Sequence, residues 1–173
     1  YRQFFQFGIE AVGIDDPLID AEVISVAYRA FSKMGLKNFI LKISSLGDSE
    51  SRKKHREDLL KFLSNVELDE ETRARVIKNP LRIFDDKRRE IQNKLQGAPL
   101  LLDYLSHESK EKFEKVQSAL RSIGISFEID PMMVRGLDYY TGTAFEFVHN
   151  QLGAQATICG GGRYDGLMET LGG

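Results

Sequence analysis

Cysteine is almost absent from this chain of 173 residues, and its scarcity excludes several kinds of site. A single cysteine, Cys159, rules out an intramolecular disulfide and any zinc site built from several cysteines. We expect Cys159 to be a small packed residue and the protein to work in a reducing, cytoplasmic setting. The three histidines, His55, His107 and His149, are scattered without HxxxH spacing, which argues against a protein-ligated metal.

Long apolar runs are missing as well. No stretch approaches the roughly 20 apolar residues of a membrane span, and the first residues lack the layout of a signal peptide, so we expect no membrane association. The net charge of −2 argues against a strongly basic nucleic-acid binder. It hides an asymmetry, because residues 50–94 hold 13 Lys/Arg against 10 Asp/Glu. Residues 52–56 and 87–89 could contact an RNA backbone or could be solvated helix faces.

The first 46 residues follow a strand, helix, strand pattern. Residues 3–13 alternate between apolar and polar side chains, which predicts a strand. Asp16 followed by Pro17 is typical of a helix start, and Gly35 ends the helical spacing. Residues 38–44 read as a second strand. The helix is expected to bury Ile19, Val23, Val26, Ala27, Ala30, Phe31 and Met34.

Charged helical segments then dominate. They lie near residues 50–63, 69–78, 86–96 and 107–123, and Ser106 and Gly124 are expected to cap and end the last one. A run of helices between two strand-rich stretches predicts a helical insertion domain over residues 47–124, called the insert below. Its small core is expected to contain Leu60, Leu63, Val76, Ile77, Leu81, Ile91 and Leu95.

Strands return after the insert. Those expected are a short one at residues 126–130 and longer ones at 139–149 and 155–159, followed by a helix over 165–171. Strands, helices and again strands predict an α+β fold. The two strand-rich stretches, residues 1–46 and 125–173, would together form one sheet-bearing domain.

Two polar, glycine-containing runs lie on or beside these strands. The first covers residues 134–146 and reads VRGLDYYTGTAFE, and the second covers residues 160–167 and reads GGGRYDGL. An arginine, paired tyrosines and a triple glycine indicate a polar pocket rather than a core. The guanidinium of Arg135 presents a fork of donors suited to phosphate. A surface ion pair, for instance with Asp138, is the alternative for Arg135.

Other residues in this part of the sequence also leave two interpretations open. Tyr139 and Tyr140 should point to opposite faces of their strand, one into the core and one into a pocket. Residues 160–162, placed after the strand ending at Cys159, could form a wall free of side chains, a phosphate-cradling loop or a sharp turn. Gln6 and Glu10 share a strand face about 13 Å apart at ~3.3 Å per residue, which would suit an amino acid or simply solvent.

The two polar runs closely resemble the family-specific motifs of histidyl-tRNA synthetases. Residues 1–10 (YRQFFQFGIE) look like the second half of that family's motif 2, so three motifs occur in the family's order. The resemblance covers nearly the whole chain and implies the mostly antiparallel sheet of class II aminoacyl-tRNA synthetases. It also implies the family's reaction, in which histidine and ATP give histidyl-adenylate and the histidyl group then passes to the 3′ end of tRNA(His).

The resemblance implies roles for individual residues. Arg135 is implied as the catalytic residue, meeting the α-phosphate of ATP and the carboxylate of histidine. Glu10 and the Tyr140 hydroxyl would hold the two imidazole nitrogens, while Tyr164 covers the ring. The full set implied to bind histidine is Gln6, Glu10, Tyr139, Tyr140, Gly160, Gly161 and Tyr164. Family members also use Mg²⁺ with ATP, form homodimers and bring their insert to the tRNA acceptor stem.

The resemblance is to part of a synthetase. The chain starts inside motif 2, and nothing resembles motif 1, motif 3 or the anticodon-binding domain. We therefore expect a catalytic-core fragment that does not catalyse the full reaction alone. Two other classes remain open: a non-catalytic synthetase-like module, such as the regulatory subunit of ATP phosphoribosyltransferase, and an RNA-binding helical module on a scaffold sheet. The intact tyrosine pair, Arg135, Gln6 and Glu10 speak against a degenerate site.

Overall fold

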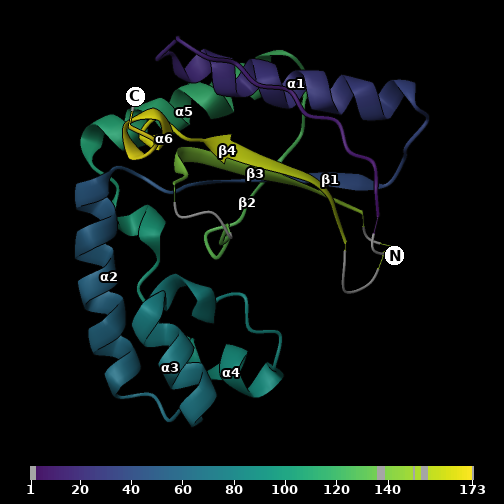
Figure 1. Cartoon of the computed structure of the whole chain (residues 1–173). Coiled ribbons are helices and arrows are strands. Elements are labelled where there is room, and N and C mark those ends of the chain that lie inside the picture. Colours follow the sequence, from purple (N-terminus) through teal and green to yellow (C-terminus); the bar gives the residue numbers. More distant parts are fainter. Residues whose placement is uncertain (1–2, 136–138, 150, 153–155, 173) are drawn as a thin grey trace.

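Figure 1 shows the computed structural model of the chain, which describes residues 3–135, 139–149, 151–152 and 156–172. Its elements, in order, are α1 (Pro17–Lys33), β1 (Phe39–Ser45), α2 (Ser49–Ser64), α3 (Glu70–Lys78), the 3₁₀ helix η1 (Pro80–Ile83), α4 (Arg89–Lys94), the 3₁₀ helix η2 (Leu101–Tyr104), α5 (His107–Ser122), β2 (Glu128–Ile129), β3 (Thr141–His149), β4 (Thr157–Arg163) and α6 (Leu167–Thr170). Among the described helices, none has the length and apolar character needed to cross a membrane.

A four-stranded sheet forms the centre of the structure, with the strands in the order β2-β1-β3-β4. The β1–β2 pair is parallel, whereas β3 pairs antiparallel with β1 and with β4. Ile43 lies opposite Phe145, which in turn lies opposite Gly161. The predicted α+β class and mostly antiparallel sheet are confirmed.

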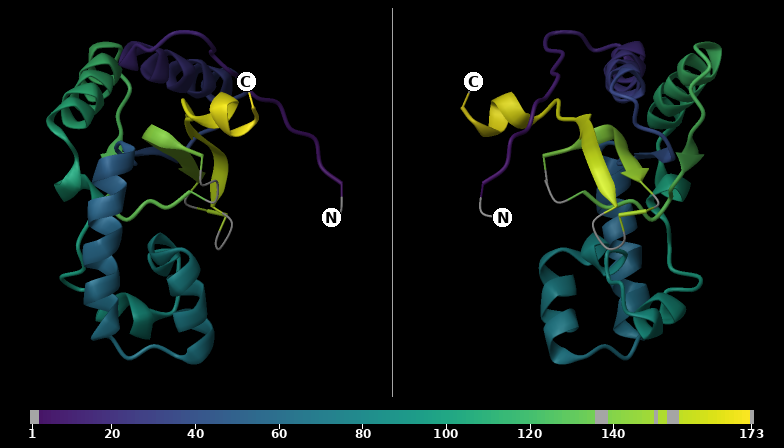
Figure 2. Two further views of the ribbon diagram at one scale, coloured as in Figure 1. Left: turned by 60° about the vertical axis from the view of Figure 1, so that its left-hand side comes forward. Right: turned by 90° about the vertical axis from the view of Figure 1, so that its right-hand side faces the viewer.

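Helices α1 and α5 lie side by side over one face of the sheet (Figures 1 and 2). An apolar cluster fills the space between these helices and the sheet. Because side chains alternate along a strand, every second residue of a strand can enter it. Its members from the sheet include Leu41 and Ile43 of β1 and Phe145 and Phe147 of β3. The rings of Phe31 and Phe147 meet edge to face with centroids 5.3 Å apart. Lys42 of β1 and Glu146 of β3 pair with each other and lie on the opposite face of the sheet.

Helix α1 begins where the sequence predicts. The carboxylate of Asp16 accepts a hydrogen bond from the Leu18 amide at 2.9 Å, and Pro17 lies in the first turn. The buried face is only partly the expected one, since Val26 and Met34 are 43% and 56% exposed. The helix carries apolar residues on more than one stripe, and packing selects the stripe. Its buried residues are Ala21, Ile24, Ser25, Ala27 and Phe31.

Residues 3–13 do not form the predicted strand in the described chain. A strand needs a neighbour that pairs with its backbone N–H and C=O groups, and no described segment pairs with this one. The side chains of Phe4, Phe5 and Phe7 are therefore 76%, 96% and 69% exposed. The segment, purple in Figure 2, runs past the sheet toward the start of α1.

The insert has its own helical core beneath the sheet, formed by α2, α3, η1 and α4 (Figure 1). Four predicted core residues are buried there: Leu63, Val76, Ile91 and Leu95. Leu60 and Leu81 pack against them partly buried. Ile77 was wrongly assigned to this core, because α3 turns it outward and 63% of it is exposed.

Helix α5 packs elsewhere, although the sequence places it at the end of the insert. Phe113, Val116 and Leu120 of α5 join the cluster formed with α1 and the sheet. Packing therefore ties the last part of residues 47–124 to the sheet, and the helical core of the insert comes from α2 to α4. The division of the chain into a sheet domain and an insert over these residues stays a prediction.

Candidate active site

Three tyrosines and a glutamate from distant parts of the sequence meet near the end of β4. The rings of Tyr139 and Tyr140 lie edge to face at 5.3 Å, and those of Tyr139 and Tyr164 at 6.3 Å. The Tyr164 hydroxyl donates a hydrogen bond to Glu10, and this bond is the main reason that the pKa of Tyr164 is raised to about 12. The structure thus brings four of the predicted histidine-binding residues together.

Arg135 lies at the other side of this aromatic group. Its guanidinium carbon is 5.9 Å from the centroid of the Tyr140 ring, and its Nη1 forms an ion pair with Glu146. The Thr157 hydroxyl donates to the second oxygen of Glu146 at 3.1 Å. Both side chains of the ion pair are about one-fifth exposed, at 19% and 21%. The Arg135 Nε is buried and has no hydrogen-bond partner in the described part of the chain.

Glu146 was missed as a functional candidate. The sequence interpretation offered Asp138 as the partner of Arg135, and Asp138 lies outside the described residues, as do Gly136 and Leu137. The available signal was periodicity, because Glu146 is the polar residue between two buried phenylalanines of one strand. That position places it on the face of β3 opposite to the helices.

The triple glycine lies within β4, so the predicted strand end at Cys159 was wrong. A Cβ atom on Gly160 would lie 2.7 Å from both Nη atoms of Arg135, and one on Gly162 would lie 3.2 Å from the Tyr140 ring. A Cβ atom on Gly161, on the other face, would lie 2.7 Å from the Phe145 ring. Glycine is needed here for close approach. Arg135, Phe145 and Tyr140 therefore lie where side chains of these glycines would stand, and contact of the glycines with histidine stays a prediction.

Gln6 is not brought into this group. It lies in the exposed N-terminal segment, and within the described chain it forms no hydrogen bond. Glu10 is joined to the site through Tyr164 instead of through a shared strand face. The alternation that paired Gln6 with Glu10 requires a strand that the described chain does not contain.

Arg163, between the triple glycine and Tyr164, was also not predicted as important. Its guanidinium binds Asp20 at 3.0 Å, Asp15 at 3.1 Å and Asp165 at 3.2 Å. Burial raises the pKa of Asp20, although the hydrogen bonds from Thr143 and Arg163 oppose that rise. Arg163 thereby fastens the beginning of α1 to the end of β4, which fixes the position of Tyr164 next to it.

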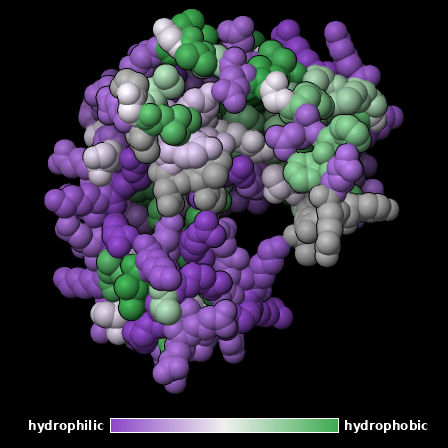
Figure 3. Space-filling model, viewed as in Figure 1, coloured by the Kyte–Doolittle hydropathy of each residue, from purple (hydrophilic) through white to green (hydrophobic). Residues whose placement is uncertain are grey.

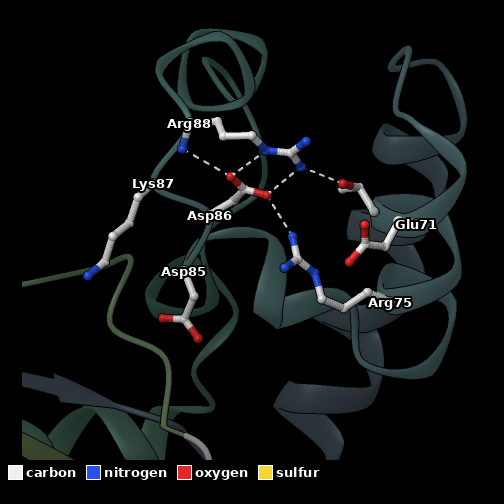
Figure 4. A pocket seen from close by; sticks show the side chains of 7 residues that line it. Glu71, Arg75, Asp85, Asp86, Lys87 and Arg88 are labelled. Atoms are coloured by element: carbon white, nitrogen blue, oxygen red, sulfur yellow. Dashed lines mark hydrogen bonds and ion pairs between the residues drawn. The ribbon is translucent and has the colours of Figure 1, made fainter. Parts of the chain in front are cut away.

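The insert contributes a charged cavity of about 290 Å³ (Figure 4). Asp86 accepts from Arg75 at 2.6 Å and from Arg88 at 2.7 Å, and these donors, Arg88 above all, hold its pKa well below the usual range. Asp85 points away from this network in Figure 4. Partial burial raises the pKa of Asp85, and its carboxyl also interacts with Glu146.

The basic runs of the insert are only partly available to a nucleic acid. His55 is 1% exposed and hydrogen-bonds the Pro99 carbonyl, while Arg88 is held by Asp86 and Asp69. Arg52 also points inward, and its Nη1 donates to the backbone carbonyl of Tyr140. Lys53, Lys54 and Arg89, from the same two runs, remain exposed. Figure 3 shows hydrophilic side chains over most of the visible insert.

Comparison with known proteins shows the family to which the chain belongs. A sequence profile described as histidyl-tRNA synthetase matches residues 1–173, the whole chain. The chain belongs to the histidyl-tRNA synthetase family. Histidine–tRNA ligases of Corynebacterium kroppenstedtii and Mycobacterium bovis are 57% and 55% identical over all 173 residues, and the match covers 41% of each relative. The resemblance found in the sequence motifs is confirmed.

Solved structures agree with this membership. Apo histidyl-tRNA synthetase of Staphylococcus aureus superposes with a TM-score of 0.72 at 40% identity, covering 94% of this chain and 40% of that one. A Bacillus halodurans structure described as ATP phosphoribosyltransferase regulatory subunit/histidyl-tRNA synthetase shares the fold, with a TM-score of 0.56 at 22% identity. The chain thus spans about two-fifths of the length of the curated histidyl-tRNA synthetase relatives it matches.

Proposed function

We propose that this chain supplies the histidine-binding part of a histidine–tRNA ligase. That enzyme activates L-histidine with ATP to histidyl-adenylate and transfers the histidyl group to the 3′ end of tRNA(His). Family membership supports the reaction class. The observation that carries the proposal is the grouping, beside the glycines of β4, of Glu10, Tyr139, Tyr140, Tyr164 and Arg135.

Recognition of the imidazole rests on two polar groups. The Glu10 carboxylate accepts one ring N–H, and its second oxygen leaves room for the bond from Tyr164. The Tyr140 hydroxyl meets the other ring nitrogen. A site that hydrogen-bonds both nitrogens can reject analogues lacking them by about 10⁴-fold, because its own polar groups would go unpaired. Gln6, Gly160 and Gly161 remain proposed contacts of the bound amino acid, the glycines through their backbone.

Arg135 serves the chemical step. A carboxylate oxygen of histidine attacks the α-phosphorus of ATP, and the bond from that phosphorus to the pyrophosphate oxygen breaks. Negative charge builds on the α-phosphate during this attack. A guanidinium fixed toward that charge contributes about 3–4 kcal/mol to transition-state stabilisation. The guanidinium is fixed by its ion pair with Glu146 and by its close approach to Gly160, which has no side chain.

Mg²⁺ accompanies the nucleotide. The described residues contain no group of three or more His, Cys, Asp or Glu side chains suited to a metal ion. We assign the Mg²⁺ to the phosphates of ATP, as the family resemblance implies. When bound there, it neutralises phosphate charge.

The remaining parts of the proposal concern partners. We propose that the exposed lysines and Arg89 of the insert approach the acceptor stem of tRNA(His), and that the enzyme works in the cytoplasm as a homodimer. Support comes from family membership and from the exposed cations of α2 and α4.

Histidine-dependent ATP–pyrophosphate exchange tests the function. It should be measured in a protein of the relatives' length that contains this chain, called the long form below. We expect exchange with L-histidine and none with other amino acids. The 173-residue chain assayed alone is expected to give none, since it spans 41% of its relatives. Histidine binding by the long form without exchange would instead indicate a non-catalytic synthetase-like module.

A further inference from the structure

The start of the insert is joined to the start of β3. The Leu46 amide donates to the Gly142 carbonyl at 2.6 Å, and the Gly142 amide donates to the Gly47 carbonyl at 3.1 Å. Gly47 has φ of +60°, and a Cβ atom there would lie 2.9 Å from Leu105. Only glycine fits this crossing without strain. The first residues of the insert and the residues after Tyr140 therefore form one rigid connection.

Asp48 fixes helix α2 at this connection. One carboxylate oxygen accepts from the Ser51 amide at 2.8 Å and caps α2, while the other accepts from the hydroxyls of Ser106 and Ser109. These bonds, that from Ser106 above all, hold the pKa of Asp48 well below its usual range. Since Ser106 caps α5, one aspartate joins the beginnings of both helices. The direction of α2 relative to the sheet is set here.

Arg52 reaches from α2 into the candidate active site. One turn after the cap, its Nη1 donates to the carbonyl oxygen of Tyr140 at 2.8 Å, and the bond is partly buried. Tyr140 also packs against an apolar cluster that includes Leu46, Leu101 and Met133, and Leu101 belongs to the insert. One hydrogen bond and one shared apolar cluster therefore connect the insert to Tyr140.

The neighbours of Arg52 show that this position is not simply part of a basic face. Lys53 and Lys54 are exposed, whereas Arg52 is half-buried and its donor is engaged. A hydrogen bond from a charged group to a carbonyl is stronger than a neutral one. Losing it would leave the carbonyl of Tyr140 without this donor and free the backbone that carries the tyrosine.

We propose that Arg52 is a positioning residue for histidine recognition: it fixes the backbone of Tyr140 from the insert. The orientation of α2 then sets the geometry of the tyrosine group. This inference rests on the proposed function, in which the Tyr140 hydroxyl holds an imidazole nitrogen. Arg52 itself touches neither histidine nor ATP.

Arg52→Met tests the proposal in the long form, because methionine keeps an apolar stem along α2 and removes the donor. We expect KM for histidine in the exchange assay to rise about tenfold or more, with KM for ATP and kcat changing less than threefold. Arg52→Lys should recover part of the loss, since an ammonium can donate to the same carbonyl. The matched control is Glu57→Met, an exposed position on the same helix, which should leave all three constants unchanged.

The outcomes separate this inference from the proposed function. Absence of histidine-dependent exchange in the unmodified long form would refute the function. Normal exchange together with an unchanged KM for histidine in folded Arg52→Met would refute the role of Arg52 alone. An equal rise in KM for histidine and in KM for ATP, with no recovery in Arg52→Lys, would show that Arg52 is only a general structural contact and would refute the proposal. If Arg52→Met does not fold, Arg52→Lys decides: we expect a severalfold rise in KM for histidine only, and no rise refutes the proposal.

Discussion

Replacing Gly160 by alanine perturbs the candidate active site at one point. The new methyl group would lie 2.7 Å from both Nη atoms of Arg135 and 2.9 Å from its Cζ, whereas ordinary contact begins at 3.4 Å. The guanidinium must therefore move by about 0.7 Å. It can do so at little cost in stability, because it is the far end of a flexible side chain. Gly160→Ala should thus fold normally with Arg135 displaced.

A displacement of this size has a large effect on chemistry and a small one on folding. Misplacing a catalytic group by about 1 Å can cost about 10²-fold in rate, so we expect single-turnover formation of histidyl-adenylate by the long form to fall by roughly that factor. Chemical denaturation should place the stability of Gly160→Ala within about 1 kcal/mol of the unmodified protein. Gly160→Ala should therefore lower the rate of adenylate formation and leave the free energy of unfolding nearly unchanged.

The neighbouring glycine provides the contrast. In Gly161→Ala the methyl group would lie 2.7 Å from the Phe145 ring in the core, and overpacking of this kind costs about 1–3 kcal/mol of stability. Gly166→Ala is the neutral control, because the added methyl meets open space. If folded Gly160→Ala forms adenylate at the rate of the unmodified protein, the close approach of Arg135 to Gly160 does not position Arg135 for catalysis.

Two further predictions concern the insert. Replacing Lys53, Lys54 and Arg89 together by alanine should weaken tRNA binding by the long form. The slope of log K against log salt concentration should become shallower by roughly 2–3, at about 0.7–0.9 per lost phosphate contact. An unchanged slope would show that these residues are solvated and do not contact the tRNA. Burial lowers the pKa of His55, so the folded protein prefers the neutral ring and its stability should fall as pH drops below the unfolded value of 6.5. The unfolding free energy should decrease as the pH falls below 6.5, by up to about 1.4 kcal/mol per pH unit. His55→Gln should remove this contribution and His107→Gln, at an 89% exposed side chain, should keep it.

Elements defined by local signals were predicted well from the sequence. Asp16 and Pro17 mark the start of α1, and a short β-rich run marks β1, because caps and alternation act within a few residues. The segment at residues 3–13 failed for the opposite reason. Its alternation is local, whereas a strand exists only when a neighbouring segment pairs with it.

The structure brings together part of the predicted residue set, and their binding of histidine stays a prediction. Tyr139, Tyr140, Tyr164 and Glu10 meet as the motifs indicate. The placement of Arg135 on the glycine run could not be derived, because it depends on which side chain crosses the strand from a distant segment.

The insert shows the same limit. The sequence of a charged helix does not show which of its basic residues are buried. Packing decides this: Arg52 and His55 turn inward, while Lys53 stays exposed. Burial of a cation is set by a partner such as the Tyr140 carbonyl, and that partner lies 88 positions away in the chain.

One measurement tests the division of roles in this site most directly: the single-turnover rate of histidyl-adenylate formation by the long form, followed across histidine concentrations, for Glu10→Ala and Arg135→Ala. Loss of a hydrogen bond to a charged group costs about 1.5–3 kcal/mol, so Glu10→Ala should raise the half-saturating histidine concentration about 10- to 100-fold and largely keep the saturating rate. Arg135→Ala should lower the saturating rate about 10²–10³-fold while half-saturation changes much less. Two folded variants with unmodified half-saturation and unmodified saturating rate would contradict the assignment of recognition to Glu10 and of chemistry to Arg135.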